Sequence, residues 1–246
     1  MDFSIVKIAK KVKPYLKRHT SRIFRSILLE PFGFDWLSKP YPGHKKLISH
    51  INYKRGFFVE VGANDGYFQD PTYYYERILD WKGILIEPLL LYKKCKKNRP
   101  KSLVLNFACV PSDYEKDSVV LIDSNAMSFV KNGIPNEQEW IEEWERISDR
   151  QHREISVPAK TLTKILDDYF STRALREIDL LSIDVEGFEL EVLKGLDFEK
   201  YNPKYILLES HSNVLLEKIK TKLFPTHPTM FSITEIDFLF SKKDNT

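Results

Sequence analysis

Residues 57–67 read FFVEVGANDGY, and this stretch decides the fold that the sequence predicts. An apolar run with the β-branched residues Val59 and Val61 ends in a turn that contains Gly62 and Gly66. Buried parallel strands have this composition, and a glycine turn after such a strand leads into a helix that helps to cradle a ligand. The stretch therefore predicts a strand followed by a cofactor loop.

The type of cofactor follows from Glu60 and from the glycine spacing. The pattern from Gly62 to Gly66 lacks one glycine of the dinucleotide fingerprint G-x-G-x-x-G. A carboxylate at Glu60 would repel a pyrophosphate and attract an ammonium or a sulfonium group. S-Adenosylmethionine carries both cations, so the sequence favours it over a nicotinamide dinucleotide. An ordinary strand and turn with a solvated glutamate is the alternative interpretation.

The composition indicates one catalytic-sized domain with an added arm. The chain has 246 residues, of which 42% are hydrophobic and 30% are charged, and it contains two cysteines. Two cysteines are too few for a disulfide framework, and the first residues lack the pattern of a signal peptide. No apolar run approaches the roughly 18 residues that a membrane span needs. We therefore expect a cytoplasmic protein.

A net charge of +3 conceals a difference between the arm and the body. Residues 1–55 hold 13 lysines and arginines against three acids, whereas the other 191 residues hold 25 against 32. The arm shows apolar residues at near-helical spacing, interrupted at Pro14, before a turn-rich connector at residues 31–56. Such a basic helix lies either on the body or on an anionic membrane surface, which would make the protein membrane-peripheral. Because the arm lacks a series of stacking aromatics, we expect no nucleic-acid partner, and the oligomeric state stays open.

Strand and helix signals alternate through residues 56–246. This alternation predicts an α/β fold with a mostly parallel sheet that helices cover on both faces. An acidic helical insert at about residues 135–154 interrupts it, with Trp140, Ile141, Trp144 and Ile147 as an apolar stripe. The insert either packs by this stripe or forms a substrate lid. Strands are expected at residues 57–61, 83–87, 101–110, 119–122, 156–159, 178–184, 205–211 and 231–240, and helices at 72–79, 92–99, 162–170 and 185–195.

Two segments at strand ends predict contacts with the nucleoside part of the cofactor. Glu87 lies 21 residues beyond Gly66. At this distance a strand, loop, helix and strand unit places an acid on the ribose hydroxyls. Asn106 and Ala108 lie at the end of the strand expected at 101–110, where small residues let an adenine ring approach the backbone.

A second group of polar residues follows two later strands. Asp184 and Glu186 end the strand at 178–184, while Glu209 and His211 end the strand at 205–211. Ligands of an open α/β sheet bind outside the carboxyl ends of the strands, so we expect these side chains to converge on the acceptor. His211 is the candidate general base, since histidine titrates near neutral pH, and a surface histidine is the alternative. Asp184 and Glu209 are also candidate ligands of Mg²⁺, although a third oxygen ligand is not evident.

Taken together and in order, the motifs resemble the FkbM-type family of S-adenosylmethionine-dependent methyltransferases. They read VEVGANDG at 59–66, IEP at 86–88 and IDLLSIDVEGFE at 178–189, with VLKG at 192–195 behind them. The resemblance spans about residues 57–211. It implies a Rossmann-like class I methyltransferase fold with a seven-stranded sheet. It also implies O-methylation of a hydroxyl on a sugar, a glycan or a secondary metabolite, since members are similar in this activity and some relatives methylate carboxylates.

The resemblance further implies that residues 60–66 hold the methionine part, that Glu87 holds the ribose, and that methyl transfer occurs at residues 184–187. A nucleic-acid amino-methyltransferase would show a polar residue, two prolines and an aromatic where this chain reads DVEG. A carboxyl O-methyltransferase and a non-catalytic binding module that keeps the fold are the alternatives. The expected catalytic residues are Asp184, Glu186 and His211, and the expected cofactor-binding residues are Glu60, Gly62, Ala63, Asn64, Asp65, Gly66, Glu87, Pro88, Asn106 and Ala108.

Overall fold

The computed structural model describes residues 41–243, except for 124–127, 135–136, 149–150 and 175–176. The predicted basic helix of the arm and its membrane contact therefore lie outside the described residues. Within the predicted connector, helix α3 (His44–His50) packs on the sheet through Leu47, next to the buried Ile51. The division predicted between residues 55 and 56 stays a prediction. None of the helices in the described part of the chain has the length and apolar character that a membrane crossing requires.

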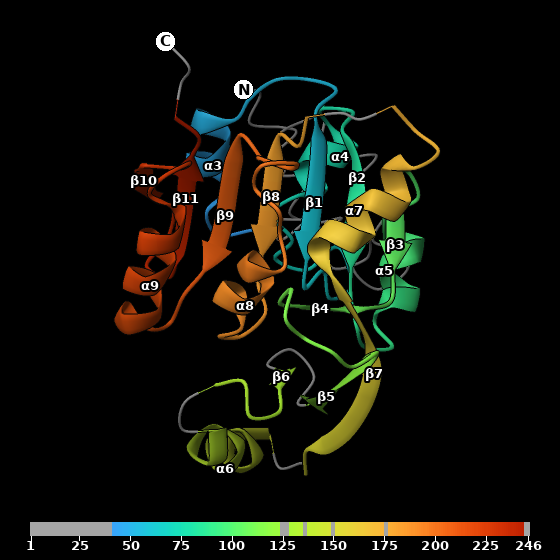
Figure 1. Ribbon diagram of the computed structural model, residues 1–246, viewed down its shortest axis with the longest axis vertical. Helices are drawn as coiled ribbons and strands as arrows, with labels where there is room; N and C mark the ends of the chain where they lie inside the picture. The colour runs from blue at the N-terminus through green and yellow to red at the C-terminus, as the bar shows by residue number, and fades with distance from the viewer. Residues whose placement is uncertain (1–40, 124–127, 135–136, 149–150, 175–176, 244–246) are drawn as a thin grey trace, which may run out of the picture.

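Seven strands form the main sheet, in the order β10-β11-β9-β8-β1-β2-β3 (Figure 1). The five strands from β9 to β3 pair in parallel, whereas β11 is antiparallel to β9 and to β10. Counted along the chain, the parallel part runs 3-2-1-4-5, the doubly wound order with its switch point between β1 and β8. This is the Rossmann-like class I methyltransferase architecture that the sequence predicts. The strands are β1 (Phe57–Val61), β2 (Lys82–Ile86), β3 (Leu103–Leu105), β8 (Leu180–Ile183), β9 (Tyr205–Glu209), β10 (Thr229–Ser232) and β11 (Asp237–Ser241).

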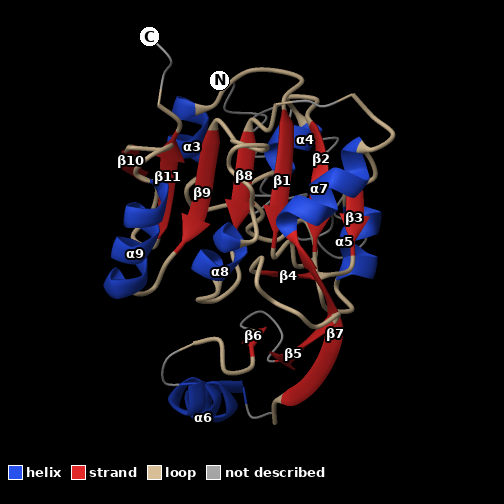
Figure 2. Cartoon of the chain, viewed as in Figure 1, coloured by secondary structure: helices blue, strands red, loops and turns tan. Residues whose placement is uncertain are grey.

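The central strands β1 and β8 are buried along their whole length because both faces of the sheet are covered (Figure 2). Phe57, Val59 and Val61 of β1 join the core on the face of α7, α8 and α9, while Phe58 joins the core on the face of α3, α4 and α5. Alternation along a strand therefore supplies two cores from one apolar run. The helices are α4 (Tyr73–Arg77), α5 (Tyr92–Asn98), α7 (Leu162–Phe170), α8 (Glu189–Lys194) and α9 (Asn213–Leu223).

A second sheet lies beyond the carboxyl ends of the central strands, in the order β4-β7-β5-β6 (Figure 1). Its core contains Leu121 and Val157, and Ile141 of α6 packs with Ile122 and Phe129. The predicted acidic insert is thus the helical part of a larger insertion between β3 and β8. The insertion comprises β4 (Ala108–Val110), β5 (Ser118–Asp123), β6 (Phe129–Val130), α6 (Glu137–Ser148) and β7 (Arg153–Thr161).

Two predicted strands are wrong in their extent. The strand expected at residues 101–110 is divided, because β3 pairs with β2 whereas β4 pairs with β7 of the other sheet. The chain turns at Asn106, whose amide donates to the carbonyl oxygens of Glu87 and Pro88 at 2.9 and 2.7 Å. The strand expected at 231–240 is the hairpin of β10 and β11, whose turn is fixed where the Asp237 N–H donates to the Thr234 hydroxyl oxygen at 2.9 Å. Apolar periodicity does not reveal a turn inside an apolar run.

Candidate functional site

A cavity of about 330 Å³ opens at the carboxyl ends of β1, β2 and β8, and we call it the first cavity. This volume lies in the range of small-molecule sites. Most of the predicted site residues line it, although they come from segments between residues 60 and 209. Those that line it are Glu60, Gly62, Ala63, Asn64, Glu87, Pro88, Ala108, Asp184, Glu186 and Glu209.

The glycine loop after β1 passes very close to the end of β8. Gly62 has φ of 87°, and a Cβ atom on it would lie 1.7 Å from the carbonyl oxygen of Asp184. Only glycine fits a position that needs both a left-handed backbone and this contact. Gly66, with φ of 67°, instead packs on α5, where a Cβ would lie 2.7 Å from Cys95 Sγ.

Three predicted cofactor residues do not line the first cavity. The Asp65 carboxylate accepts the backbone N–H groups of Tyr67 and Phe68 at 3.1 and 2.8 Å, so it shapes the loop. Gly66 and Asn106 likewise hold the backbone around the cavity through the contacts given above. These residues thus support the loops and do not themselves face the cavity.

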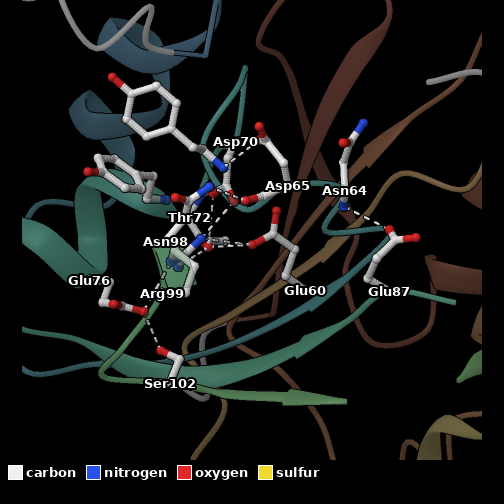
Figure 3. A network of polar contacts seen from close by, with 12 residues as sticks. Glu60, Asn64, Asp65, Asp70, Thr72, Glu76, Glu87, Asn98, Arg99 and Ser102 are labelled. Carbon is white, nitrogen blue, oxygen red and sulfur yellow. Dashed lines mark hydrogen bonds and ion pairs between the residues drawn. The ribbon is translucent and has the colours of Figure 1, made fainter. Parts of the chain in front are cut away.

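Glu87 is held as an acceptor at the end of β2. Its Oε2 accepts the Asn64 N–H at 2.8 Å (Figure 3), and its Oε1 accepts the Leu89 N–H at 2.8 Å. Each carboxylate oxygen has a second lone pair, so the group keeps capacity for two hydroxyl donors. Burial raises the pKa of Glu87 to about 7.

Glu60 is part of a buried network that the sequence did not reveal (Figure 3). The Thr72 hydroxyl donates to Glu60 Oε2 at 2.5 Å, and Arg99 Nη1 lies 3.6 Å from the same oxygen. Arg99 is fully buried and also pairs with Asp70 at 2.7 Å and with Glu76 at 3.1 Å. Burial raises the pKa of Glu60 well above its ordinary value, and Arg99 opposes this rise.

Sequence reasoning missed Asp70 and Arg99. Asp70 lines the first cavity, and Arg99 stands at the end of α5 among lysines. A lone arginine on a basic helix has the sequence signature of a solvated side chain. In the structure Arg99 is buried because acids at positions 60, 70 and 76, all far from it in sequence, surround its guanidinium group.

A second cavity of about 620 Å³ adjoins the first. Phe129, Glu186 and Glu209 line both cavities, so the two meet at these side chains. The insertion contributes Phe129 and Trp140 to the second cavity, and the main domain contributes residues of α8 and α9. The second cavity therefore lies between the insertion and the main domain.

The predicted acceptor-side residues come together where the cavities meet. His211 Nε2 lies 3.0 Å from Glu209 Oε1, and Glu209 in turn shares a hydrogen bond with Asp184. His211 lines only the second cavity and is 43% exposed, whereas Asp184 lines only the first and is accessible from it. Burial, followed by the charge of Glu209, raises the pKa of Asp184 well above its ordinary value. Burial, with the charges of Asp184 and Glu189, raises the pKa of Glu186 to about 8.

The predicted magnesium site is not supported. Among the residues that the structure describes, no group of three or more histidine, cysteine, aspartate or glutamate side chains is arranged to hold a metal ion. Burial and then the charge of Glu209 raise the pKa of Asp184, so the two neighbouring acids favour sharing a proton over carrying two charges. A shared proton accounts for this contact of two acids without a metal.

Comparison with known proteins gives a family for the chain's main domain. The model of the methyltransferase FkbM domain matches residues 60–239. The methyltransferase sdnD of Sordaria araneosa is 45% identical over 51 residues, so the match covers 19% of this chain and only 20% of that relative.

Two solved structures are also similar. The human methyltransferase 10 domain containing protein has 11% identity and a TM-score of 0.43, over 82% of this chain and 83% of that one. TrmK of M. capricolum, solved with the cofactor product S-adenosylhomocysteine, has 9% identity and a TM-score of 0.40, over 82% and 70%.

Proposed function

The chain belongs to the methyltransferase FkbM domain family, and on that premise we propose that it transfers a methyl group from S-adenosylmethionine to a hydroxyl oxygen of a sugar, a glycan or a secondary metabolite. One observation carries the proposal. The first cavity, which the family motifs line, opens beside a larger cavity, and the two share Glu186 and Glu209. A donor in one and an acceptor in the other would meet at these carboxyl groups.

The residues of the first cavity fit S-adenosylmethionine. The fixed Glu87 carboxylate suits the two ribose hydroxyls, and Phe107 and Ala108 offer an apolar wall for adenine. Glu60 and Asp70 provide negative charge for the ammonium group. When bound, the cofactor supplies a methyl group on a sulfonium centre.

On this proposal, the second cavity positions the acceptor and removes its proton. His211 faces this cavity and pairs with Glu209, which orients the imidazole. His211 would accept the proton of the acceptor hydroxyl, and since an aliphatic hydroxyl is a weak acid, that proton leaves in concert with transfer. Orientation of the acceptor supplies much of the rest of the rate acceleration, because methyl transfer needs the acceptor oxygen in line with the bond from sulfur to the methyl group.

The charges of the second cavity favour a hydroxyl over a carboxylate acceptor. Glu186, Glu189, Glu191 and Glu209 line it, whereas its basic side chains are His211 and Lys218. An anionic acceptor would be repelled by each of these groups that is ionised, which includes Glu186 above its raised pKa of about 8. A neutral hydroxyl acceptor would instead find many hydrogen-bond acceptors.

A transfer assay on the full chain tests the proposal. The protein is incubated with S-adenosylmethionine and matched acceptor pairs that carry either a hydroxyl or a carboxylate on the same skeleton, and mass spectrometry follows the gain of one methylene. We expect an ether product that resists mild base. An ester product would favour the carboxyl methyltransferase, and cofactor binding without product on any acceptor would favour the binding module.

A further inference from the structure

The buried carboxylates behind the first cavity outnumber the cation that they contact. Glu60, Asp70 and Glu76 all surround Arg99, which in the described ranges is the only cationic side chain with which these three acids form an ion pair. All four side chains are at least nine-tenths buried. Burying a charge without a partner costs free energy, so the excess of carboxylates favours the binding of a further cation or of protons.

Arg99 compensates Glu60 least, since its Nη1 lies 3.6 Å from Glu60 Oε2 and only 2.7 Å from Asp70 Oδ2. Arg99 Nε is 3.1 Å from Glu76 and its Nη2 donates to Thr72 at 2.7 Å, and the guanidinium lies 5.1 Å from the Phe58 ring centroid. Glu76 also accepts from the Ser102 hydroxyl at 2.5 Å. Arg99 is thereby fixed, and it cannot move closer to Glu60 without loosening its contacts with Asp70, Thr72 and Glu76.

Glu60 and Asp70 both open onto the first cavity, and Glu76 does not. On the basis of the proposed function, we infer that the ammonium group of S-adenosylmethionine is the missing cation of this cluster. It enters beside Glu60 and Asp70 and displaces to solvent a proton that the two acids hold in its absence. Asp70 is then a cofactor-binding residue, and Arg99 is a positioning residue.

Burial and Arg99 shift the pKa values of Glu60 and Asp70 in opposite directions. Burial is the largest influence that raises the pKa of Glu60 and of Asp70, and Asp184 at the end of β8 raises that of Glu60 further. Arg99 after α5 opposes both, and it is itself shared with Glu76 on α4. Cys95 on α5, whose pKa burial raises, also lies beside the pair.

An incoming cation lowers both pKa values and releases the proton. The affinity therefore falls as the pH is lowered, by up to about tenfold per pH unit once the pair is protonated in the free protein.

Titration calorimetry measures the released proton directly. The wild-type full chain is titrated at one pH with S-adenosylhomocysteine, which has the ammonium group, and with methylthioadenosine, which keeps the nucleoside and lacks the amino acid. Each titration is run in phosphate and in Tris buffer, whose ionisation enthalpies differ. We expect the binding enthalpy of S-adenosylhomocysteine to depend on the buffer more strongly than that of methylthioadenosine, since the nucleoside probe reports only on Glu87 and its surroundings.

The outcomes separate the inference from the proposed function. Equal buffer dependence for the two probes would overturn the proton exchange while leaving the methyltransferase proposal intact. No binding of S-adenosylmethionine or S-adenosylhomocysteine would overturn the proposed function itself.

A variant at the cavity tests the assignment of the residue. Asp70→Asn removes one charge of the pair, and we expect it to reduce the extra proton release with S-adenosylhomocysteine by at least about half. Asp80→Asn, an exposed carboxylate paired with Lys101, is the matched control and should release protons as the wild type does. Circular dichroism shows whether Asp70→Asn is folded, and if it is not, the comparison of the two probes on the wild type decides alone. Unchanged release in folded Asp70→Asn would exclude Asp70 from the exchange.

Discussion

The two cavities share Glu186 and Glu209, yet their charges are held in different ways. In the first, two backbone N–H groups fix Glu87, and Glu60 has Thr72 and Arg99 as partners. In the second, Glu189 keeps one buried oxygen without a hydrogen-bond partner among the described residues. The first cavity is therefore preorganised by fixed partners of its acids, whereas the second holds an acid that is only half satisfied and is completed by the insertion.

The largest effect should come from the glycine at the base of the first cavity. Gly62→Val forces a side chain into the Asp184 carbonyl at a positive φ, so we expect cofactor binding to fall below detection and stability to drop by about 3 kcal/mol or more. Calorimetry and thermal melting measure the two effects. Asn64→Gly is the control, since Asn64 has φ of 49° and its N–H to Glu87 is retained. Near-normal binding by Gly62→Val would show that the loop is not preorganised.

The next effect should separate chemistry from cofactor binding. His211→Ala removes the proposed base from the second cavity, so we expect kcat to fall by about 100-fold or more while the Kd of S-adenosylmethionine stays unchanged. His152→Ala is a matched control, because His152 also pairs with a glutamate, Glu145 at 2.7 Å, and lines neither cavity. An equal loss of cofactor affinity in His211→Ala would contradict the division of roles.

A third prediction concerns the uncompensated acid of the second cavity. Burial raises the pKa of Glu189 to about 7, so the folded protein binds more protons than the unfolded chain between the ordinary value and 7. The contribution of Glu189 to stability is therefore full in acid and is lost as the pH rises through about 7.

Glu189→Gln should remove this loss of stability at high pH. Its Oε1 can still accept the N–H groups of Val185 and Gly187, so we expect the variant to be more stable than the wild type at about pH 8, by about 1–3 kcal/mol, and no more stable in acid. Denaturant unfolding at several pH values measures this. Glu191→Gln, whose carboxylate pairs with Lys194, is the control that should leave the profile unchanged. If stability depends on pH in Glu189→Gln as it does in the wild type, burial does not raise the pKa of Glu189.

The smallest effect should come from the insertion. Trp140 is 36% exposed and lines only the second cavity, so Trp140→Ala should raise KM for the acceptor by about tenfold without changing the Kd of S-adenosylmethionine. Phe224→Ala is the control, since Phe224 is a more exposed aromatic that lines neither cavity. A normal KM in Trp140→Ala would indicate that the insertion does not contact the acceptor.

Features that depend on neighbours in the chain were predictable. Local hydrophobic periodicity and turn-forming residues were enough to predict three features. These are the strand and glycine turn at residues 57–66, the helix at 162–170, and Glu87 at the end of the next strand. The α/β class and the approach of Asp184 to Glu60 followed, because parallel strands present their carboxyl ends on one edge.

Only the tertiary structure shows which residues and strands become partners. Arg99 looks solvated by sequence, and it is buried because three acids from separate segments surround it. The strand expected at 101–110 divides because β4 finds a better partner in β7, about 50 residues further along the chain, which no local pattern encodes. The second cavity likewise exists only once the insertion has packed beside α8 and α9. Periodicity records which side of an element is buried, whereas the identity of the neighbour, and hence the charge that each acid meets, depends on contacts between residues distant in sequence.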